Sequence, residues 1–243
     1  SCRNFLATKT GGNLFRSVRA SRPLPPNTHV YFEFHVSQLA RRRSQDGKHT
    51  EDSVAAAGMQ TDAAEAADTD TDADLETVIS VGVALDKMPL NVPVGTCPSS
   101  IGFQSAGQIV TASQLVKTIS HGYVDDDGNG ADLGFGCGDT IGVLAHVAVL
   151  SPNQEMTRTS AVVSVDFFVN GRPVGTQKPV SVEFRGGLTG LNIFPTLSIL
   201  SESTFVLGLF SAADLRFPPS PDQVLAGTTV YALDGTTVVV GED

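Results

Sequence analysis

Residues 138–150 read G-D-T-I-G-V-L-A-H-V-A-V-L, and residues 165–175 read V-D-F-F-V-N-G-R-P-V-G. The first segment is mostly apolar from Thr140 to Leu150, the length of a strand that is buried on both faces. The second contains Asn170-Gly171, the dipeptide best suited to the two positive-φ positions of a tight hairpin turn. We therefore predict two adjacent antiparallel strands at the centre of a β-sandwich, because each must bury an apolar face against a second layer.

The cysteine content indicates the compartment. The 243-residue chain has three cysteines, Cys2, Cys97 and Cys137, an odd number without C-x-x-C spacing, so neither a disulfide framework nor a zinc site is indicated. We expect an intracellular protein, cytoplasmic or nuclear. No apolar run approaches the roughly 20 residues that cross a bilayer, so we expect no membrane span.

The negative charge is concentrated in one segment. The formal net charge is −10, and residues 46–76 contain ten acidic residues and one lysine, which leaves about −1 for the rest of the chain. We expect no nucleic acid partner, because a nearly neutral folded part does not attract phosphates. Low hydrophobicity and repeated Thr-Asp units predict a disordered acidic insertion at residues 41–76. It is either a loop insertion that the fold tolerates or a charged regulatory segment.

Two further segments are clear strands. Residues 29–36, H-V-Y-F-E-F-H-V, place Tyr31, Glu33 and His35 on one face, and we expect that face to be solvated. Residues 77–85 form another strand, in which Gly82 predicts a bulge or a close approach of backbones.

Residues 125–130 resemble a calcium-binding loop. Asp125, Asp127 and Asn129 alternate and Gly130 follows, as in an EF-hand, but Gly136 occupies the twelfth position, where a bidentate Glu is required. We therefore favour a solvated loop between strands.

No pattern of catalytic residues is present. The sequence has no G-x-S-x-G, and its histidines lack a recognisable nucleophile context. Gly134, Gly136 and Gly138 alternate like a phosphate cradle, but a strand rather than a helix is predicted after them. We expect no enzymatic activity, no cofactor and no metal.

The C-terminal residues predict a second hairpin. Residues 228–233 and 236–240 flank Asp234-Gly235, which favours a type I′ turn. Neither face is polar and an isolated hairpin is marginal, so it must dock. It packs on its own sandwich or offers an edge to another chain.

Several short blocks follow one another in the order found in the SPRY domain family. The blocks are V-R-A-S-R-P-L (18–24), Y-F-E-F (31–34), S-V-G-V-A (80–84), V-G (94–95) with S-S-I-G-F (99–103), G-D-T-I-G-V-L (138–144), F-F-V-N-G (167–171), V-G (174–175), F-P-T-L-S-I (194–199), V-L-G-L-F (206–210) and F-P-P (217–219). The chain resembles that family over about residues 14–221.

The resemblance implies a bent sandwich of two antiparallel sheets, a concanavalin-like jelly roll, that serves as a protein-interaction module. It implies a SPRY-type domain at 14–221, interrupted by the insertion at 41–76, between an N-terminal segment at 1–13 and a C-terminal hairpin extension at 222–243. Members of the family bind partners through loops at one end of the sandwich.

We therefore predict a non-catalytic adaptor or scaffold that binds a protein partner through its loops. The contact residues we predict are Tyr123, Asp125, Asp127 and Arg185, because exposed aromatic and charged side chains on supported loops dominate binding. The loops considered are 89–96, 120–132, 158–159, 185–189 and 212–216. The alternatives are a structural subunit of a large multiprotein assembly, and a binding domain appended to an enzyme, such as a ubiquitin ligase, outside this chain.

Overall fold

The computed structural model describes residues 5–8, 15–38, 79–111, 114–118, 134–150, 160–174, 179–185, 191–200 and 204–242. These residues belong to one compact unit, residues 1–40 and 77–243. The acidic insertion predicted at 41–76 lies outside the described residues, and the predicted domain boundaries remain predictions.

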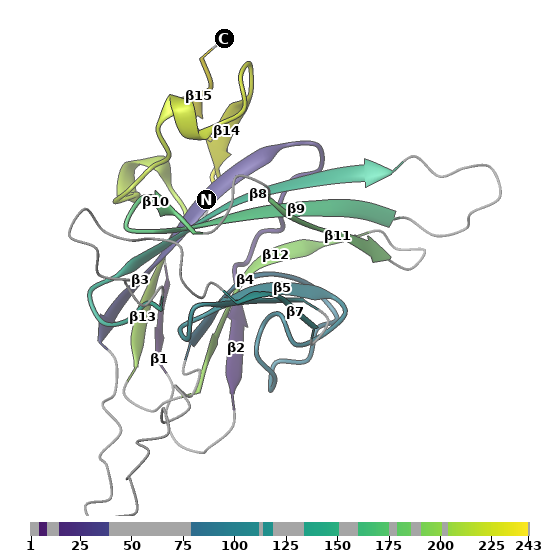
Figure 1. Cartoon of the computed structure of the whole chain (residues 1–243), viewed down its shortest axis with the longest axis vertical. Helices are drawn as coiled ribbons and strands as arrows, with labels where there is room; N and C mark the ends of the chain where they lie inside the picture. Colours follow the sequence, from purple (N-terminus) through teal and green to yellow (C-terminus); the bar gives the residue numbers. More distant parts are fainter. Residues whose placement is uncertain are drawn as a thin grey trace, which may run out of the picture. The chain divides into compact units, whose positions relative to one another are not determined.

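Two sheets form the described part of this unit, and their strands pair antiparallel except where β14 meets β3 (Figure 1). Nine of the described strands belong to the first, which we call the large sheet, and its main path runs β1-β13-β3-β8-β9-β10, with β11 on β9 and β14–β15 on β3. Its strands are β1 (Phe5–Thr8), β3 (His29–Gln38), β8 (Thr140–Leu150), β9 (Ser160–Val169), β10 (Arg172–Pro173), β11 (Val180–Arg185), β13 (Phe205–Leu209), β14 (Thr229–Ala232) and β15 (Thr237–Val240).

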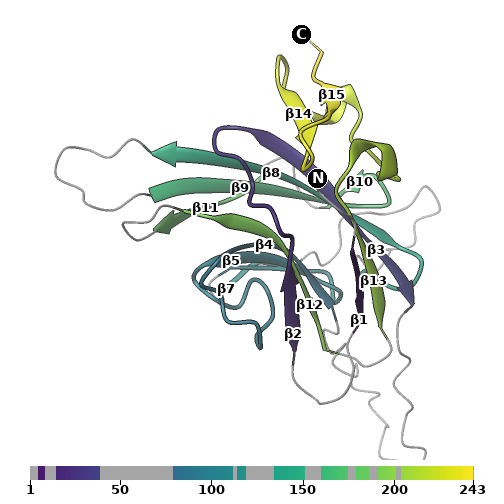
Figure 2. The same cartoon turned by 180° about the vertical axis from the view of Figure 1, so that it is seen from behind.

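Six strands in the order β2-β12-β4-β5-β6-β7 form the other sheet, which we call the small sheet. They are β2 (Arg16–Arg19), β4 (Ile79–Leu85), β5 (Ser100–Gln104), β6 (Gln108–Thr111), β7 (Gln114–Thr118) and β12 (Ile193–Ile199). Two 3-10 turns, η1 (Ala212–Asp214) and η2 (Pro221–Gln223), lie between β13 and β14. Figure 2 shows the two sheets from behind. The predicted fold class is confirmed by this pairing.

The central hairpin is as predicted. Strands β8 and β9 pair antiparallel from Ile141 opposite Val169 to Leu150 opposite Ser160. The predicted turn lies between β9 and β10, where Arg172 is opposite Val169. Asn170 and Gly171 have φ angles of 50° and 78°, so both turn positions are left-handed, as a type I′ turn requires.

The core lies between the sheets and is aromatic at its centre. Phe32 and Phe34 of β3 pack edge to face, with ring centroids 5.7 Å apart, and Phe34 packs on Phe210 in the same manner. Phe103 of the small sheet contacts Phe167 of the large sheet at 5.5 Å. This contact joins the two layers, so the apolar face of each strand is buried, as a sandwich requires.

The C-terminal hairpin docks on its own sandwich, one of the two predicted outcomes. Strand β14 pairs with β15 and, in parallel orientation, with the start of β3, where Val230 lies opposite His29. The predicted type I′ turn is wrong, because Gly235 has φ 91° and Asp234 is not left-handed. Ala232 N–H bonds to Thr236 O and Gly235 N–H to Ala232 O, which is a longer loop with one left-handed glycine.

Gly82 marks a close approach of two backbones, as predicted. It lies opposite Gly102 of β5, and a Cβ on Gly82 would lie 2.0 Å from the carbonyl oxygen of Ile101. A side chain at Gly82 would therefore separate β4 from β5, and one at Gly102 would displace Val94, whose backbone oxygen lies 2.2 Å from the position of a Cβ there.

Within the part of the chain that the structure describes, no helix is long and apolar enough to cross a membrane.

Candidate interaction surface

A row of serines on the outer face of the small sheet holds a long loop in place. Ser17 of β2 and Ser80 of β4 flank Ser198 of β12 in register, and their small side chains leave room for residues 86–98 to lie on the sheet. Ser80 and Ser198 have no exposed surface although they face away from the core. The loop is therefore what buries them.

The serine hydroxyls satisfy the backbone of this loop. Ser17 Oγ donates to Val92 O at 2.9 Å, and Ser80 Oγ donates to Val94 O at 2.8 Å. Val94 N–H donates to Ser198 Oγ at 2.9 Å, and Gly95 N–H donates to Ser100 Oγ at 2.8 Å. These bonds come from four different strands, so the loop has a single defined path.

The first turn of the loop is held by Arg19. Its guanidinium donates to the backbone oxygens of Asp86 and Met88, and burial lowers the pKa of Arg19 more than the nearby carboxylate of Asp86 raises it. The arginine stays charged, because even a lowered arginine pKa lies far above neutrality. Met88 and Val94 then pack on Ala84 beneath the loop.

The tip of this loop is exposed although its ends are fixed. Leu90 is 51% exposed, and Pro89 and Asn91 beside it are also exposed. An exposed leucine on a backbone that is held at both ends loses little conformational entropy on binding, so it suits a contact with a partner.

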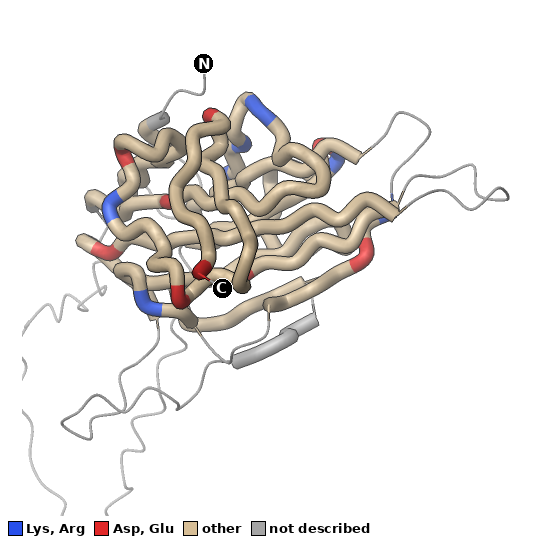
Figure 3. Tube along the Cα trace, turned by 90° about the horizontal axis from the view of Figure 1, so that it is seen from above, with Lys and Arg blue, Asp and Glu red and all other residues tan. Residues whose placement is uncertain are grey.

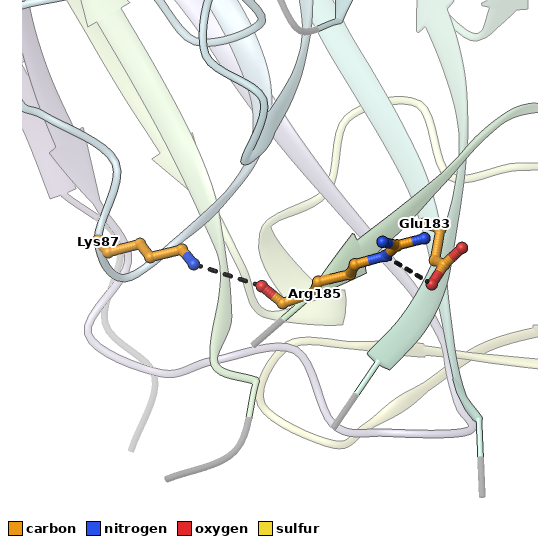
Figure 4. A network of polar contacts seen from close by, with 3 residues as sticks. All are labelled: Lys87, Glu183 and Arg185. Atoms are coloured by element: carbon orange, nitrogen blue, oxygen red, sulfur yellow. Dashed lines mark hydrogen bonds and ion pairs between the residues drawn. The ribbon is translucent and has the colours of Figure 1, made fainter. Parts of the chain in front are cut away.

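Lys87 connects this loop to the large sheet. Lys87 Nζ donates to the backbone oxygen of Arg185 at 3.3 Å, and Arg185 Nε donates to Glu183 Oε1 at 3.1 Å, as Figure 4 shows. The Arg185 and Glu183 side chains are 76% and 43% exposed, so this ion pair adds little stability. We call Lys87, Pro89, Leu90, Asn91 and Arg185 the Lys87 surface.

The structure places one of the four predicted contact residues. Arg185 ends β11 and is exposed, whereas Tyr123, Asp125 and Asp127 lie outside the described residues. The resemblance of residues 125–130 to a calcium loop lies there too. Lys87 was missed by the sequence reasoning, and the only available signal was its position beside the predicted loop 89–96.

The predicted loops do not all lie together. Arg185 pairs with Ser160 at the start of β9, whereas Arg216 lies near Glu33 and His35, and His35 pairs with Thr140 near the end of β9. About ten residues of strand, roughly 30 Å, separate these positions. Residues 212–216 therefore belong to a different surface from Arg185.

The face of β3 that we expected to be solvated is mostly buried. Tyr31 and Glu33 are 1% and 0% exposed, and only His35 is half-buried. The reason is that residues 216–217 cross this face: Arg216 N–H donates to Glu33 Oε2 at 2.7 Å, and Phe217 N–H donates to Glu33 Oε1 at 2.8 Å. The carboxylate therefore serves as a backbone partner for a distant segment.

Burial dominates the ionisation of this pair. It raises the pKa of Glu33, against the opposing effect of the two backbone N–H donors, and it also raises the pKa of Tyr31. The Tyr31 hydroxyl lies 2.8 Å from Phe217 O and 3.2 Å from Glu33 Oε1, and it has one proton for these two acceptors. Both groups are covered, so they act in folding rather than on a substrate.

Two histidines stack at the other end of β3. His29 and His146 lie opposite each other on β3 and β8, with ring centroids 4.0 Å apart and planes 5° from parallel. Burial lowers the pKa of both rings, and the charge of His146 lowers the pKa of His29 further. Among the residues that the structure describes, no group of three or more His, Cys, Asp or Glu side chains could hold a metal ion.

Comparison with known proteins bears on the fold. No family model matches the chain, and no curated protein does. It is similar to a crystal structure of a human SPRY domain, with 16% identity, 84% of this chain and 90% of that chain covered, and a TM-score of 0.46. It is also similar to the SPRY domain of human HERC1, with 13% identity, 84% and 87% covered, and a TM-score of 0.44. Both structures are of the family that the sequence blocks resemble, and the likeness concerns the fold alone.

Proposed function

We propose that this chain is a non-catalytic protein-interaction module, an adaptor or scaffold, that binds a protein partner through the Lys87 surface. Tyr123, Asp125 and Asp127 are proposed as further contact residues for a protein partner. The resemblance of the sequence blocks to the SPRY family supports a role in protein binding. The half-buried Cys97 and the exposed Cys137 are free thiols, which fits the proposed intracellular location.

One observation carries the proposal: an exposed apolar residue stands on a loop that four strands hold in place. The Leu90 side chain is 51% exposed, whereas its backbone is fixed, because Ser17 N–H donates to Leu90 O at 2.8 Å. The backbone of Leu90 is fixed before any partner binds, so burial of its side chain in a contact costs little further conformational entropy.

Charged residues accompany the loop of Leu90. Lys87, three residues before Leu90, bonds to the backbone oxygen of Arg185, and Arg185 pairs with Glu183. We propose that these charges form part of the polar rim of the contact. Arginine is enriched among residues that dominate binding energy, so we expect Arg185 to contribute most of the polar part.

The test compares two surfaces in the same chain. Proteins captured by the intact chain are cross-linked and identified by mass spectrometry, beside a Leu90→Asp variant and a Tyr123→Ala, Arg185→Ala double variant. A Leu6→Asp variant is the matched control, because Leu6 is 61% exposed on β1. We expect the intact chain and the Leu6→Asp control to capture partners that cross-link through Lys87. The two variants of the proposed surface should lose these partners.

Two outcomes would reject the proposal. Partners that persist in both variants would place the contact elsewhere, and partners lost equally in the Leu6→Asp control would indicate general damage. Poor solubility of the isolated, correctly folded chain would instead favour a structural subunit of an assembly.

A further inference from the structure

Strand β15 is an open edge of the large sheet. It pairs with β14 alone among the described strands, and no backbone hydrogen bond joins Thr237–Val240 to any other described segment. Gly241 N–H donates to Thr228 O on the β14 side. Because successive residues of a strand alternate, the N–H and C=O of Val240 point to the unpaired side.

Apolar side chains lie at this edge. Val240 is 53% exposed, and Leu225 is 78% exposed, the highest value among the large apolar residues that the structure describes. Gly241, which follows Val240, lies against the backbone oxygen of Leu225, so both apolar residues border the C-terminal end of β15. Natural proteins usually protect an open edge with lysine or proline, and the T-V-V-V sequence of β15 has neither.

The C-terminal segment that carries the edge has charges of one sign. Residues 217–243 contain Asp222, Asp234, Glu242 and Asp243 and no lysine or arginine. Figure 3 shows acidic colour beside the C-terminal end. Burial acts to raise the pKa of Asp234, but hydrogen bonds from Thr236 and Ser211, together with the charge of Arg22, hold it below its ordinary value. Asp234 therefore has a basic neighbour at the turn, whereas Glu242 follows the Val240 end of the strand.

We propose that β15 binds an extended, basic segment of a partner protein, which adds to the large sheet as a further strand. Backbone hydrogen bonds to Val240 provide the affinity, the apolar side chains of the segment cover Val240 and Leu225, and its Lys or Arg residues face Asp222 and Glu242. A second copy of this chain fits less well, because two such edges would bring acidic residues of both copies together. This surface shares no residue with the Lys87 surface, so an experiment can reject one of the two proposals and leave the other intact.

The test uses the full chain and a labelled ten-residue peptide in which Lys alternates with Val. Binding is measured by fluorescence anisotropy at low ionic strength, and hydrogen exchange reports on residues 237–241. We expect saturable binding with slowed exchange at these residues, and no binding of the same peptide with Glu in place of Lys.

A proline variant isolates the edge. Val240→Pro removes the outward N–H and leaves the bonds to β14, since proline is tolerated where an edge N–H faces solvent. We expect it to weaken binding at least about tenfold with an unchanged melting temperature. A Glu242→Lys variant keeps the edge and should weaken binding of the basic peptide as well.

Three outcomes would overturn the proposal. They are equal binding of the Lys and Glu peptides, binding that the Val240→Pro variant retains while it stays folded, and dimerisation of the wild type, but not of the proline variant, in sedimentation experiments. The last would identify a second copy as the occupant.

Discussion

Glu33 accepts the backbone N–H of Phe217 at 2.8 Å, although 184 residues separate them in the chain. Its other carboxylate oxygen accepts Arg216 N–H at 2.7 Å. The segment after β13 is not part of a strand, so its backbone N–H groups need acceptors outside a sheet, and the buried carboxylate of Glu33 provides two. Glu33 therefore fixes the path by which the chain reaches η2 and the C-terminal hairpin.

Glu33→Ala should destabilise the fold by about 1 to 3 kcal/mol, because it removes the acceptor of two partly buried backbone N–H groups. Chemical denaturation measures the change, and hydrogen exchange should show faster exchange at Arg216 and Phe217. Glu183→Ala is the control, since Glu183 is 43% exposed, and it should change stability by less than about 0.5 kcal/mol. Equal effects of the two variants would contradict this role.

Gly142→Ala should displace Tyr31. A Cβ at Gly142 would lie 2.0 Å from the Tyr31 hydroxyl oxygen and 2.7 Å from its ring, so the tyrosine must leave its bond to Phe217 O. We expect a loss of about 2 kcal/mol or more. Gly136→Ala is the matched control, because nothing lies within 4 Å of a Cβ there. A Gly142→Ala protein with unchanged melting temperature would show that Tyr31 adjusts freely.

The sandwich could be predicted because its signals are local. The apolar run of β8, the Asn170-Gly171 turn and the alternation in β3 each depend on a few neighbouring residues. The type I′ turn predicted at Asp234-Gly235 did not form, although this dipeptide allows the turn as Asn170-Gly171 does. The pairing of β14 with β15 shifts register between Val230 and Tyr231, while β14 also pairs with β3, and a dipeptide does not reveal such a register.

The surfaces could not be predicted in this way. Tyr31 and Glu33 alternate with apolar residues, so they resemble an exposed face, but segments distant in the chain bury them: residues 216–217 cover Glu33, and Val224 and Val230 pack with Tyr31. The approach of Lys87 to Arg185 likewise joins a loop of one sheet to a strand of the other. Such pairings depend on tertiary structure, which one sequence does not reveal.

The His29–His146 stack should make the fold sensitive to mild acid. Burial lowers the pKa of both rings, so the folded chain binds fewer protons than the unfolded chain, whose histidines titrate near 6.5. The stability that the neutral rings provide is therefore present above about pH 6.5 and is lost as the pH falls below it. A His146→Thr variant should lose less melting temperature than the wild type between pH 7 and pH 5.5. Parallel curves for the two proteins would exclude the stack as the cause.

Asp166 should have the opposite pH dependence to the histidine stack, because its ionisation destabilises the fold as the pH rises. It lies on β9 opposite Leu144, it has no hydrogen-bond or ionic partner among the described residues, and burial raises its pKa to about 6 from an ordinary 3.8. The folded chain therefore holds this proton more tightly than the unfolded chain, and the carboxylate destabilises the fold progressively as the pH rises from about 4 to about 6. Asp166→Asn should stabilise the protein by about 1 kcal/mol at pH 7.5, after allowance for partial solvent screening, and by nearly nothing at pH 4. Denaturation midpoints at the two pH values measure this, with Asp222→Asn as an exposed control that should show no such difference. A gain for Asp166→Asn that is equal at both pH values would reflect packing of the amide rather than removal of a buried charge.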